Sequence, residues 1–497
     1  MEPAKKMHSG VVSASENRLR NAFVALVVVI HCLMVLLPSV NQEFVFADGA
    51  RFFTTHDQSL LDRYFSYQAN TLGLPWLAHI VAYVLPLQTL AVIRLLSVAG
   101  IVLLTAGFIR IGRYQGEPVG INMLALLLLN PLIWTYSARA TADFLPAALA
   151  IFAMSLAIEA GQNVLLLLLS GSLLGFASIL KPHVFCVFLV LFGLLWSGRK
   201  RVSPWSPAAI VFVASVGMLA AYLAKVHEAF GFWITPPRFQ HIHALSISTA
   251  NIGSNFVAYM GFLVMLTVPL SLIVPGIGEF LQRHWKVFLP LAIGLVLVFA
   301  VGIHDEGEMN LGPLDRFVPK SVQSGIFILL SMFCVAPVLV SQGVDDSNAH
   351  IRKAVGLAVL AALLVFSLSR PAQRYLLPLL PLFLVILPRE ALRKKTLIVA
   401  TVLVFASINV FIGYSQWCTG TAAIKMVQAL QSAGLLDETD PGAIAGDVGN
   451  YFRAEHLGNA RYVVVPGVAN NSRLTVSSGG PLGKAYSLVA VANGEHR

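Results

Sequence analysis

The sequence predicts an all-α polytopic membrane protein with about thirteen transmembrane helices. Hydrophobic residues make up 57% of the 497 residues, and only 12% are charged. Soluble domains carry roughly 25% charged residues. The apolar residues also fall in runs that approach the length needed to cross a bilayer, about 20 residues. A water-soluble core could not bury this much apolar surface, so we expect lipid to cover it.

Thirteen apolar runs along the chain are the candidate spans. We expect each to be helical, because lipid offers no partners to free backbone N–H and C=O groups. Together they define a predicted transmembrane domain at residues 22–414, preceded by a polar cytoplasmic segment at 1–21. The spans are 22–40, 90–112, 120–134, 144–160, 164–180, 184–196, 207–224, 256–277, 287–303, 321–340, 354–368, 376–387 and 396–414.

Two segments outside the spans have structure of their own. The first outer loop, 41–88, ends in an apolar and aromatic stretch at 71–86 that is short for a span, so we expect interfacial helices there. After residue 414 the hydropathy drops. The tail at 415–497 has a helical pattern at 422–433 and short strand patterns at 461–466 and 485–492. It therefore predicts a small C-terminal α/β domain.

The distribution of Lys and Arg predicts the orientation. With the N-terminus inside, clusters such as Arg199-Lys200-Arg201 and Arg393-Lys394-Lys395 fall on the cytoplasmic side. The C-terminal tail then lies on the outer side. The net charge of +10 is thus a topology signal, and we expect a lipid bilayer and no nucleic acid as partner.

On this topology, a set of acidic and basic residues gathers at the outer rim of the membrane. Charges at a membrane are costly, so they tend to line a cavity or to pair with one another. Carboxylates and cations at one interface suit a reaction on an anionic lipid. The set comprises Asp48, Asp57, Asp143, Arg139, Lys181, Arg370 and Arg374.

Glycosyl transfer from a sugar on a lipid phosphate fits these residue types. The phosphate leaves with growing negative charge, which fixed cations stabilise. Lys181 and Arg374 are the predicted phosphate ligands, with Arg370 as an alternative. Asp48 is the predicted base for the acceptor hydroxyl. A single base implies inversion at the anomeric carbon.

Each of these residues also has a structural interpretation. Asp48 and Asp57 are also compatible with ordinary loop acids in water. Asp143 precedes an apolar run and suits the first turn of a helix, where the helix dipole favours an acid. Lys181 and Arg374 stand at span ends, where long cations commonly extend toward the membrane surface.

Five stretches resemble the GT-C superfamily of integral-membrane glycosyltransferases, in particular the bacterial relatives of protein O-mannosyltransferases and the lipid A aminoarabinose transferase. They are 46–53 (FADGARFF), 72–77 (LGLPWL), 137–146 (SARATADFLP), 175–182 (GFASILKP) and 374–381 (RYLLPLLP). The resemblance implies a polyprenyl-phosphate sugar donor, an active site on the outer face of a bacterial inner membrane, and Asp48 as base. The common form has two adjacent acids; here Gly49 follows Asp48, and Asp57 is the alternative base.

Cofactor, acceptor and competing functions stay open at this stage. No His or Cys spacing indicates a metal site, although Asp305, Glu306 and Glu308 could hold a divalent cation with a lipid phosphate. The acceptor hydroxyl could belong to a glycolipid, a polysaccharide or a protein. The alternatives are a transporter or flippase of lipid-linked saccharides, and a non-catalytic envelope assembly protein.

Overall fold

The computed structural model of the chain is mostly helical. It describes residues 14–36, 73–85, 89–114, 119–137, 141–197, 205–231, 233, 249–268, 282, 285, 318–319, 322–323, 325–331, 349–368, 372–387, 395–444 and 460–491. Within these ranges, four helices are long and apolar enough to cross a membrane: Ser15–Met34, Val92–Tyr114, Ser206–Glu228 and Lys395–Ser432. The other predicted spans correspond to shorter helices or lie outside the described ranges.

The helical elements follow one another along the chain, with the sheet at the end. They are α1 (Ala14–Leu36), α4 (Gly73–Val84), α5 (Thr89–Tyr114), α6 (Ile121–Leu128), α7 (Pro131–Tyr136), α8 (Phe144–Ala160), α9 (Val164–Leu180), η1 (Pro182–Cys186), α10 (Val187–Ser197), α11 (Trp205–Phe230), α13 (Thr249–Met265), α16 (Ala349–Phe366), η5 (Gln373–Leu376), α17 (Leu380–Ile386), α19 (Lys395–Ser432), η6 (Leu436–Glu438) and η7 (Gly442–Ile444).

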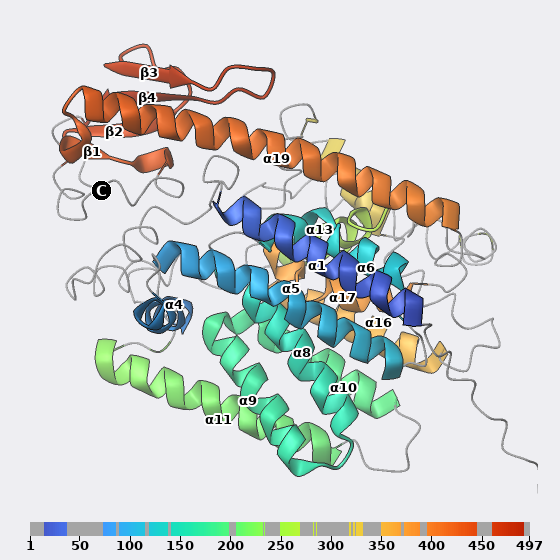
Figure 1. The fold of residues 1–497 in the computed structure, drawn as a ribbon. Coiled ribbons are helices and arrows are strands. Elements are labelled where there is room, and N and C mark those ends of the chain that lie inside the picture. Colours follow the sequence, from blue (N-terminus) through green and yellow to red (C-terminus); the bar gives the residue numbers. More distant parts are fainter. Residues whose placement is uncertain are drawn as a thin grey trace, which may run out of the picture.

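Helix α8 is apolar on every side and forms the centre of the bundle. Nearly all of its residues are buried, as expected for a helix without a polar face. It packs between α5 and α9, and α11 covers the other side of α9 (Figure 1). The helices predicted at 144–160 and 164–180 have these bounds in the structure as α8 and α9.

Small residues bring α9 and α11 into close contact. A Cβ at Gly171 would lie 2.6 Å from the Cβ of Ala214, and one at Gly175 would lie 2.8 Å from the carbonyl oxygen of Ser215. The Ser215 hydroxyl donates to the carbonyl of Gly171 across the same contact, at 2.9 Å. The glycines therefore set the distance between the two helices.

The single span predicted at 120–134 is wrong, because two short helices, α6 and α7, occupy it. Pro131 has no N–H and disfavours helical geometry in the residue before it, and Asn130 is extended at ψ 129°. The Asn130 side chain caps α7 by accepting from Leu132 N–H at 3.1 Å. Its amide also donates to the carbonyl of Leu266 at 2.7 Å.

The span predicted at 376–387 is also interrupted. The structure has the short helix η5, a turn, and then α17, which is only seven residues long. Seven residues rise about 10 Å, too little to cross a bilayer. Pro378 and Pro381 lie in this stretch and remove the donors that a continuous helix would need. The predicted span 287–303 and most of 321–340 lie outside the described ranges.

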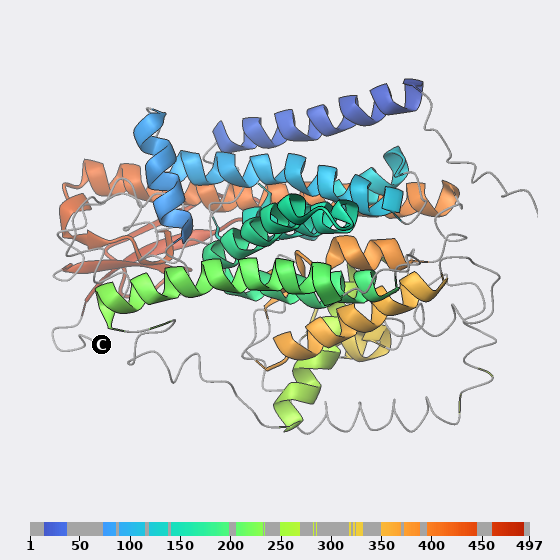
Figure 2. The same ribbon diagram turned by 90° about the horizontal axis from the view of Figure 1, so that it is seen from below.

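Helix α4 lies across the direction of its neighbours. It is seen end-on in Figure 1, where α5 and α11 are seen from the side, and Figure 2 shows it steeply inclined to α5. Ile80, Tyr83 and Val84 on α4 are exposed. The helix falls within the stretch 71–86, where the sequence predicted an interfacial helix.

Helix α19 continues without a break from the last apolar run into the tail. Its 38 residues correspond to about 57 Å, nearly twice the hydrocarbon width of a bilayer. The helix predicted at 422–433 is its last part, and it crosses the boundary predicted at residue 414. Asn409 on α19 donates to the carbonyl of Leu129 at the end of α6, at 2.8 Å.

A four-stranded sheet packs on the last turns of α19 (Figure 1). The strands are β1 (Thr439–Asp440), β2 (Tyr462–Pro466), β3 (Leu474–Ser477) and β4 (Ala485–Ala490), in the order β1-β2-β4-β3. β1 and β2 are parallel and the other pairs antiparallel. β2 and β4 confirm the two predicted strands. Met426 and Leu430 of α19 form one core with Val464 and Leu488.

Candidate functional site

The first two site residues meet because they end a helical hairpin. Asp143 precedes the first residue of α8, and Lys181 follows the last residue of α9. Pro182 disfavours helical geometry at Lys181, which is extended at φ −157° and ψ 107°. Since α8 and α9 run antiparallel, the start of α8 lies beside the end of α9. The Lys181 Nζ lies 3.4 Å from Asp143 Oδ1.

Arg374 joins this pair from a distant part of the chain. It lies on η5, and its Nε is 3.7 Å from the same Oδ1 of Asp143. Its guanidinium carbon also lies 5.8 Å from the ring centre of Tyr375. The structure therefore brings three of the predicted site residues together, which we call the charged cluster: Asp143, Lys181 and Arg374.

The charged cluster is largely shielded from solvent. The side chain of Asp143 is 5% exposed, and those of Lys181 and Arg374 are each 18% exposed. Burial alone would raise the pKa of the Asp143 carboxyl, but the positive charges of Lys181 and Arg374, with a hydrogen bond from Lys181, outweigh it. The pKa of Asp143 is therefore held below its usual value. Among the described residues, the charged cluster therefore consists of one ionised carboxylate and two cations.

His183 and Tyr375 flank the charged cluster. The sequence did not single out either of them as a site residue. The ring of His183, on η1, lies 4.5 Å from that of Tyr375 and 5.9 Å from that of Phe366. His183 also interacts electrostatically with all three residues of the charged cluster. The run Lys181-Pro182-His183 could have indicated His183 as a site residue. Pro182 ends the helix there, so the histidine stays close to the lysine.

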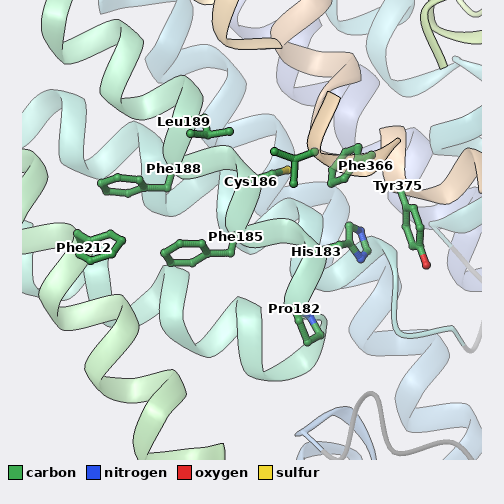
Figure 3. A pocket seen from close by; sticks show the side chains of 10 residues that line it. Pro182, His183, Phe185, Cys186, Phe188, Leu189, Phe212, Phe366 and Tyr375 are labelled. Atoms are coloured by element: carbon green, nitrogen blue, oxygen red, sulfur yellow. The ribbon is translucent and has the colours of Figure 1, made fainter. Parts of the chain in front are cut away.

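An apolar cavity of about 580 Å³ begins beside the charged cluster. His183 and Tyr375 lie at one end of it, and Phe185, Phe188 and Phe212 line the other end (Figure 3). Lining residues Leu189 and Phe212 are 38% and 42% exposed. The cavity therefore connects the charged cluster with the outer surface of α10 and α11, where apolar side chains face outward.

The remaining predicted site residues lie outside the described ranges: Asp48, Asp57, Arg139 and Arg370. The same holds for the acidic loop that contains Asp305, Glu306 and Glu308. Within the part of the chain that the structure describes, no three His, Cys, Asp or Glu side chains gather as a metal site would require. The roles assigned to all of these residues stay predictions.

A second ion pair marks the opposite end of α8. Arg110 Nε, near the end of α5, lies 3.3 Å from Glu159 Oε2. Its guanidinium also stacks 5.4 Å from the ring centre of Phe152. Both side chains are about one-third exposed, so this pair faces solvent far more than the charged cluster does.

Comparison with known proteins gives one structural likeness. No family model and no curated protein matches the sequence. The chain is similar to the crystal structure of ArnT from Cupriavidus metallidurans bound to undecaprenyl phosphate, with 13% sequence identity and a TM-score of 0.42. The similarity covers 86% of this chain and 74% of that one. At this level of identity and superposition, the likeness assigns neither a family nor a function to the chain.

Proposed function

We propose that the protein is a membrane glycosyltransferase. It transfers a sugar from a polyprenyl-phosphate donor to an acceptor hydroxyl, with inversion, at the outer face of a bacterial inner membrane. The observation that carries this proposal is the position of the charged cluster at the end of an apolar cavity that reaches the surface of α10 and α11. A lipid phosphate has the same two parts, an anionic head and a long apolar chain.

The charged cluster suits the phosphate of such a donor. It contains two cations, Lys181 and Arg374, and both retain some exposure. Guanidinium and ammonium groups bind phosphate oxygens by short, charge-assisted hydrogen bonds. As the bond to the anomeric carbon breaks, negative charge grows on the phosphate, and cations already in place stabilise it without reorganisation.

The cavity suits the lipid chain. Its walls are mainly aromatic and aliphatic side chains, and burying each CH2 group of a chain contributes about 0.8 kcal/mol. Since Leu189 and Phe212 are partly exposed, the chain can enter sideways from the bilayer. The head then reaches Lys181 and Arg374 while the rest of the lipid stays in the membrane.

Asp143 does not suit the role of base. A carboxylate held between two cations is a weak proton acceptor, because the positive charges beside it favour its ionised form. We therefore assign Asp143 to positioning Lys181 and Arg374. The base for the acceptor hydroxyl is Asp48, with Asp57 as the alternative, and one base implies a single displacement with inversion.

A transfer assay tests this proposal. Purified protein in liposomes is incubated with radiolabelled polyprenyl-phosphate sugars, and product is measured for wild type, Asp48→Asn, Lys181→Ala and Arg374→Ala. We expect each cation variant to lose roughly 100-fold or more of the activity, since it removes a contact that strengthens in the transition state. Asp48→Asn should lose a comparable factor.

The control is Lys225→Ala. Lys225 is an exposed cation on α11 that pairs with Glu228, so its loss should leave transfer unchanged. Full activity in both cation variants would reject the phosphate site, and full activity in Asp48→Asn would transfer the role of base to another residue. Movement of intact lipid-linked saccharide across the membrane without sugar transfer would favour a flippase instead.

A further inference from the structure

His183 combines burial with an unsatisfied polar atom at the candidate site. Its Nε2 is buried and has no hydrogen-bond partner among the residues that the structure describes. Leaving a buried donor or acceptor unpaired destabilises the folded state, because the group loses its hydrogen bonds to water and gains none in return. Such atoms are uncommon in folded proteins, and each calls for an explanation such as a catalytic role or a bound water or ion.

The His183 ring lies between the charged cluster and the cavity. On one side, the charges of Lys181, Asp143 and Arg374 all act on the imidazole, and Lys181 is two residues before it in the chain. On the other side, its ring packs against Tyr375 and Phe366 and lines the apolar cavity. Figure 3 shows the ring at the end of the cavity nearest Tyr375. A lipid phosphate in this cavity would have its phosphorus at this boundary.

We propose that His183 donates a hydrogen bond from Nε2 to an oxygen of the phosphate of the lipid-linked substrate. This inference rests on the proposed function and adds a third phosphate ligand to Lys181 and Arg374. A neutral imidazole donates one N–H without adding a third positive charge to the charged cluster. Hydrogen bonds to charged acceptors are the stronger class, worth about 1.5–3 kcal/mol.

His183 would also set the position of the junction between the phosphate of the lipid and its polyprenyl chain. Lys181 and Arg374 have long, rotatable side chains, whereas the His183 ring is held by two aromatic neighbours. A rigid donor at the junction selects lipids whose phosphate is attached directly at the end of the chain. His183 is therefore a substrate-contacting residue with a part in specificity.

Binding measurements on the full-length protein in nanodiscs test the inference. The ligands are a polyprenyl phosphate, the matching polyprenol without phosphate, and inorganic phosphate. The variants are His183→Phe, which keeps an aromatic ring but no donor, His183→Gln, whose amide nitrogen takes the place of Nε2, and His183→Asn, whose amide nitrogen takes that of Nδ1. Thermal midpoints are measured for all of them.

We expect His183→Phe and His183→Asn to weaken binding of polyprenyl phosphate by roughly 10-fold or more, the value of one charged hydrogen bond. His183→Gln should stay within about threefold of wild type, and polyprenol binding should not change in any variant. Inorganic phosphate should bind far more weakly than polyprenyl phosphate. Binding of inorganic phosphate as tight as that of the lipid would identify a free anion, and not a lipid head, as the ligand.

Two results would overturn the assignment of His183. One is unchanged affinity of His183→Phe for polyprenyl phosphate. The other is equal loss of polyprenol and polyprenyl-phosphate binding, which indicates a packing role only. If instead the wild type does not distinguish polyprenyl phosphate from polyprenol, the proposed function itself is wrong, so the two failures can be told apart. If His183→Phe does not fold, the affinities of His183→Gln and His183→Asn for polyprenyl phosphate are compared instead. Equal affinities of these two variants would overturn the assignment.

Discussion

Asp143 determines the charge balance of the candidate site. It contacts Lys181 and Arg374 through the same Oδ1, and it is almost fully buried. Removing one partner of a buried ion pair is strongly destabilising, because the remaining charge is left without compensation. The carboxylate therefore contributes both to stability and to the direction in which Lys181 and Arg374 point.

Replacing Asp143 by Asn should lower stability in a pH-dependent way. The pKa of Asp143 is lower in the folded protein than its usual value, so its stabilising effect is complete above about pH 4–5 and is lost as the pH falls through the folded pKa. The difference in thermal midpoint between wild type and Asp143→Asn should be constant from about pH 5 to 8 and shrink below about pH 4.

Glu228→Gln provides the control for this measurement. Glu228 forms an exposed ion pair with Lys225, with both side chains more than two-thirds exposed, and such pairs contribute little. Its thermal midpoint should match that of the wild type throughout. A difference for Asp143→Asn that grows as the pH is lowered would contradict the charge assignment of Asp143.

At the scale of elements, the charged cluster is held by the start of α8, the end of α9 and the short helix η5. Gly171 and Gly175 place α9 against α11. Gly73, the first residue of α4, lets α4 approach the end of α9, because a Cβ there would lie 2.8 Å from the carbonyl oxygen of Ile179. These contacts hold the end of α9, and with it Lys181, next to the cavity.

Narrowing the cavity should affect long-chain donors selectively. Leu189→Trp places a larger side chain in the cavity wall, and displacing about two buried CH2 groups corresponds to roughly a tenfold loss of affinity. We expect the KM for a donor with a long polyprenyl chain to rise about tenfold. The KM for a donor with only two isoprene units should change less than about twofold, since it does not reach Leu189.

Val213→Trp is the matched control on α11. Val213 is 68% exposed and is not among the residues that line the cavity. This variant should use both donors as the wild type does. Equal effects of Leu189→Trp on long and short donors would indicate that the lipid chain does not occupy this cavity.

At the scale of the whole molecule, the site and the sheet share one end of the bundle. Figures 1 and 2 both show the sheet on the same side as α4, and α4 contacts α9 close to Lys181. The turn between α8 and α9 and the Arg110–Glu159 pair lie at the opposite end. A single orientation in the membrane therefore places the charged cluster and the C-terminal sheet on one side.

Cysteine labelling tests this orientation. Asn471→Cys, in the exposed segment before β3, should react with a membrane-impermeant maleimide in intact cells whose outer membrane has been permeabilised. Gln162→Cys, in the exposed turn between α8 and α9, should react only after the inner membrane is opened. If only Gln162→Cys reacts while the inner membrane is intact, the orientation is the reverse of the predicted one. If both variants react under that condition, the predicted topology is wrong.

The sequence by itself determined the helical class, the position of most helices and two of the strands. Hydrophobic runs and their Gly and Pro boundaries are local properties, so the bounds of α8, α9, β2 and β4 could be predicted closely. The break at Asn130-Pro131 in the predicted span 120–134 was also a local signal, and the prediction of a single span did not use it. The distant partner of Asn130, the carbonyl of Leu266, is different, because nothing near residue 130 in the sequence indicates it.

The residue types of the site were also readable from the sequence, as cations and acids at the ends of apolar runs. Their arrangement was not. Only the tertiary structure decided that Asp143 contacts both Lys181 and Arg374, and that His183 and an aromatic cavity adjoin them. The reason is physical. Charges near a membrane must find partners, but Asp143 and Arg374 lie more than 200 residues apart in the sequence, and only the packing of the helices selects which charges meet.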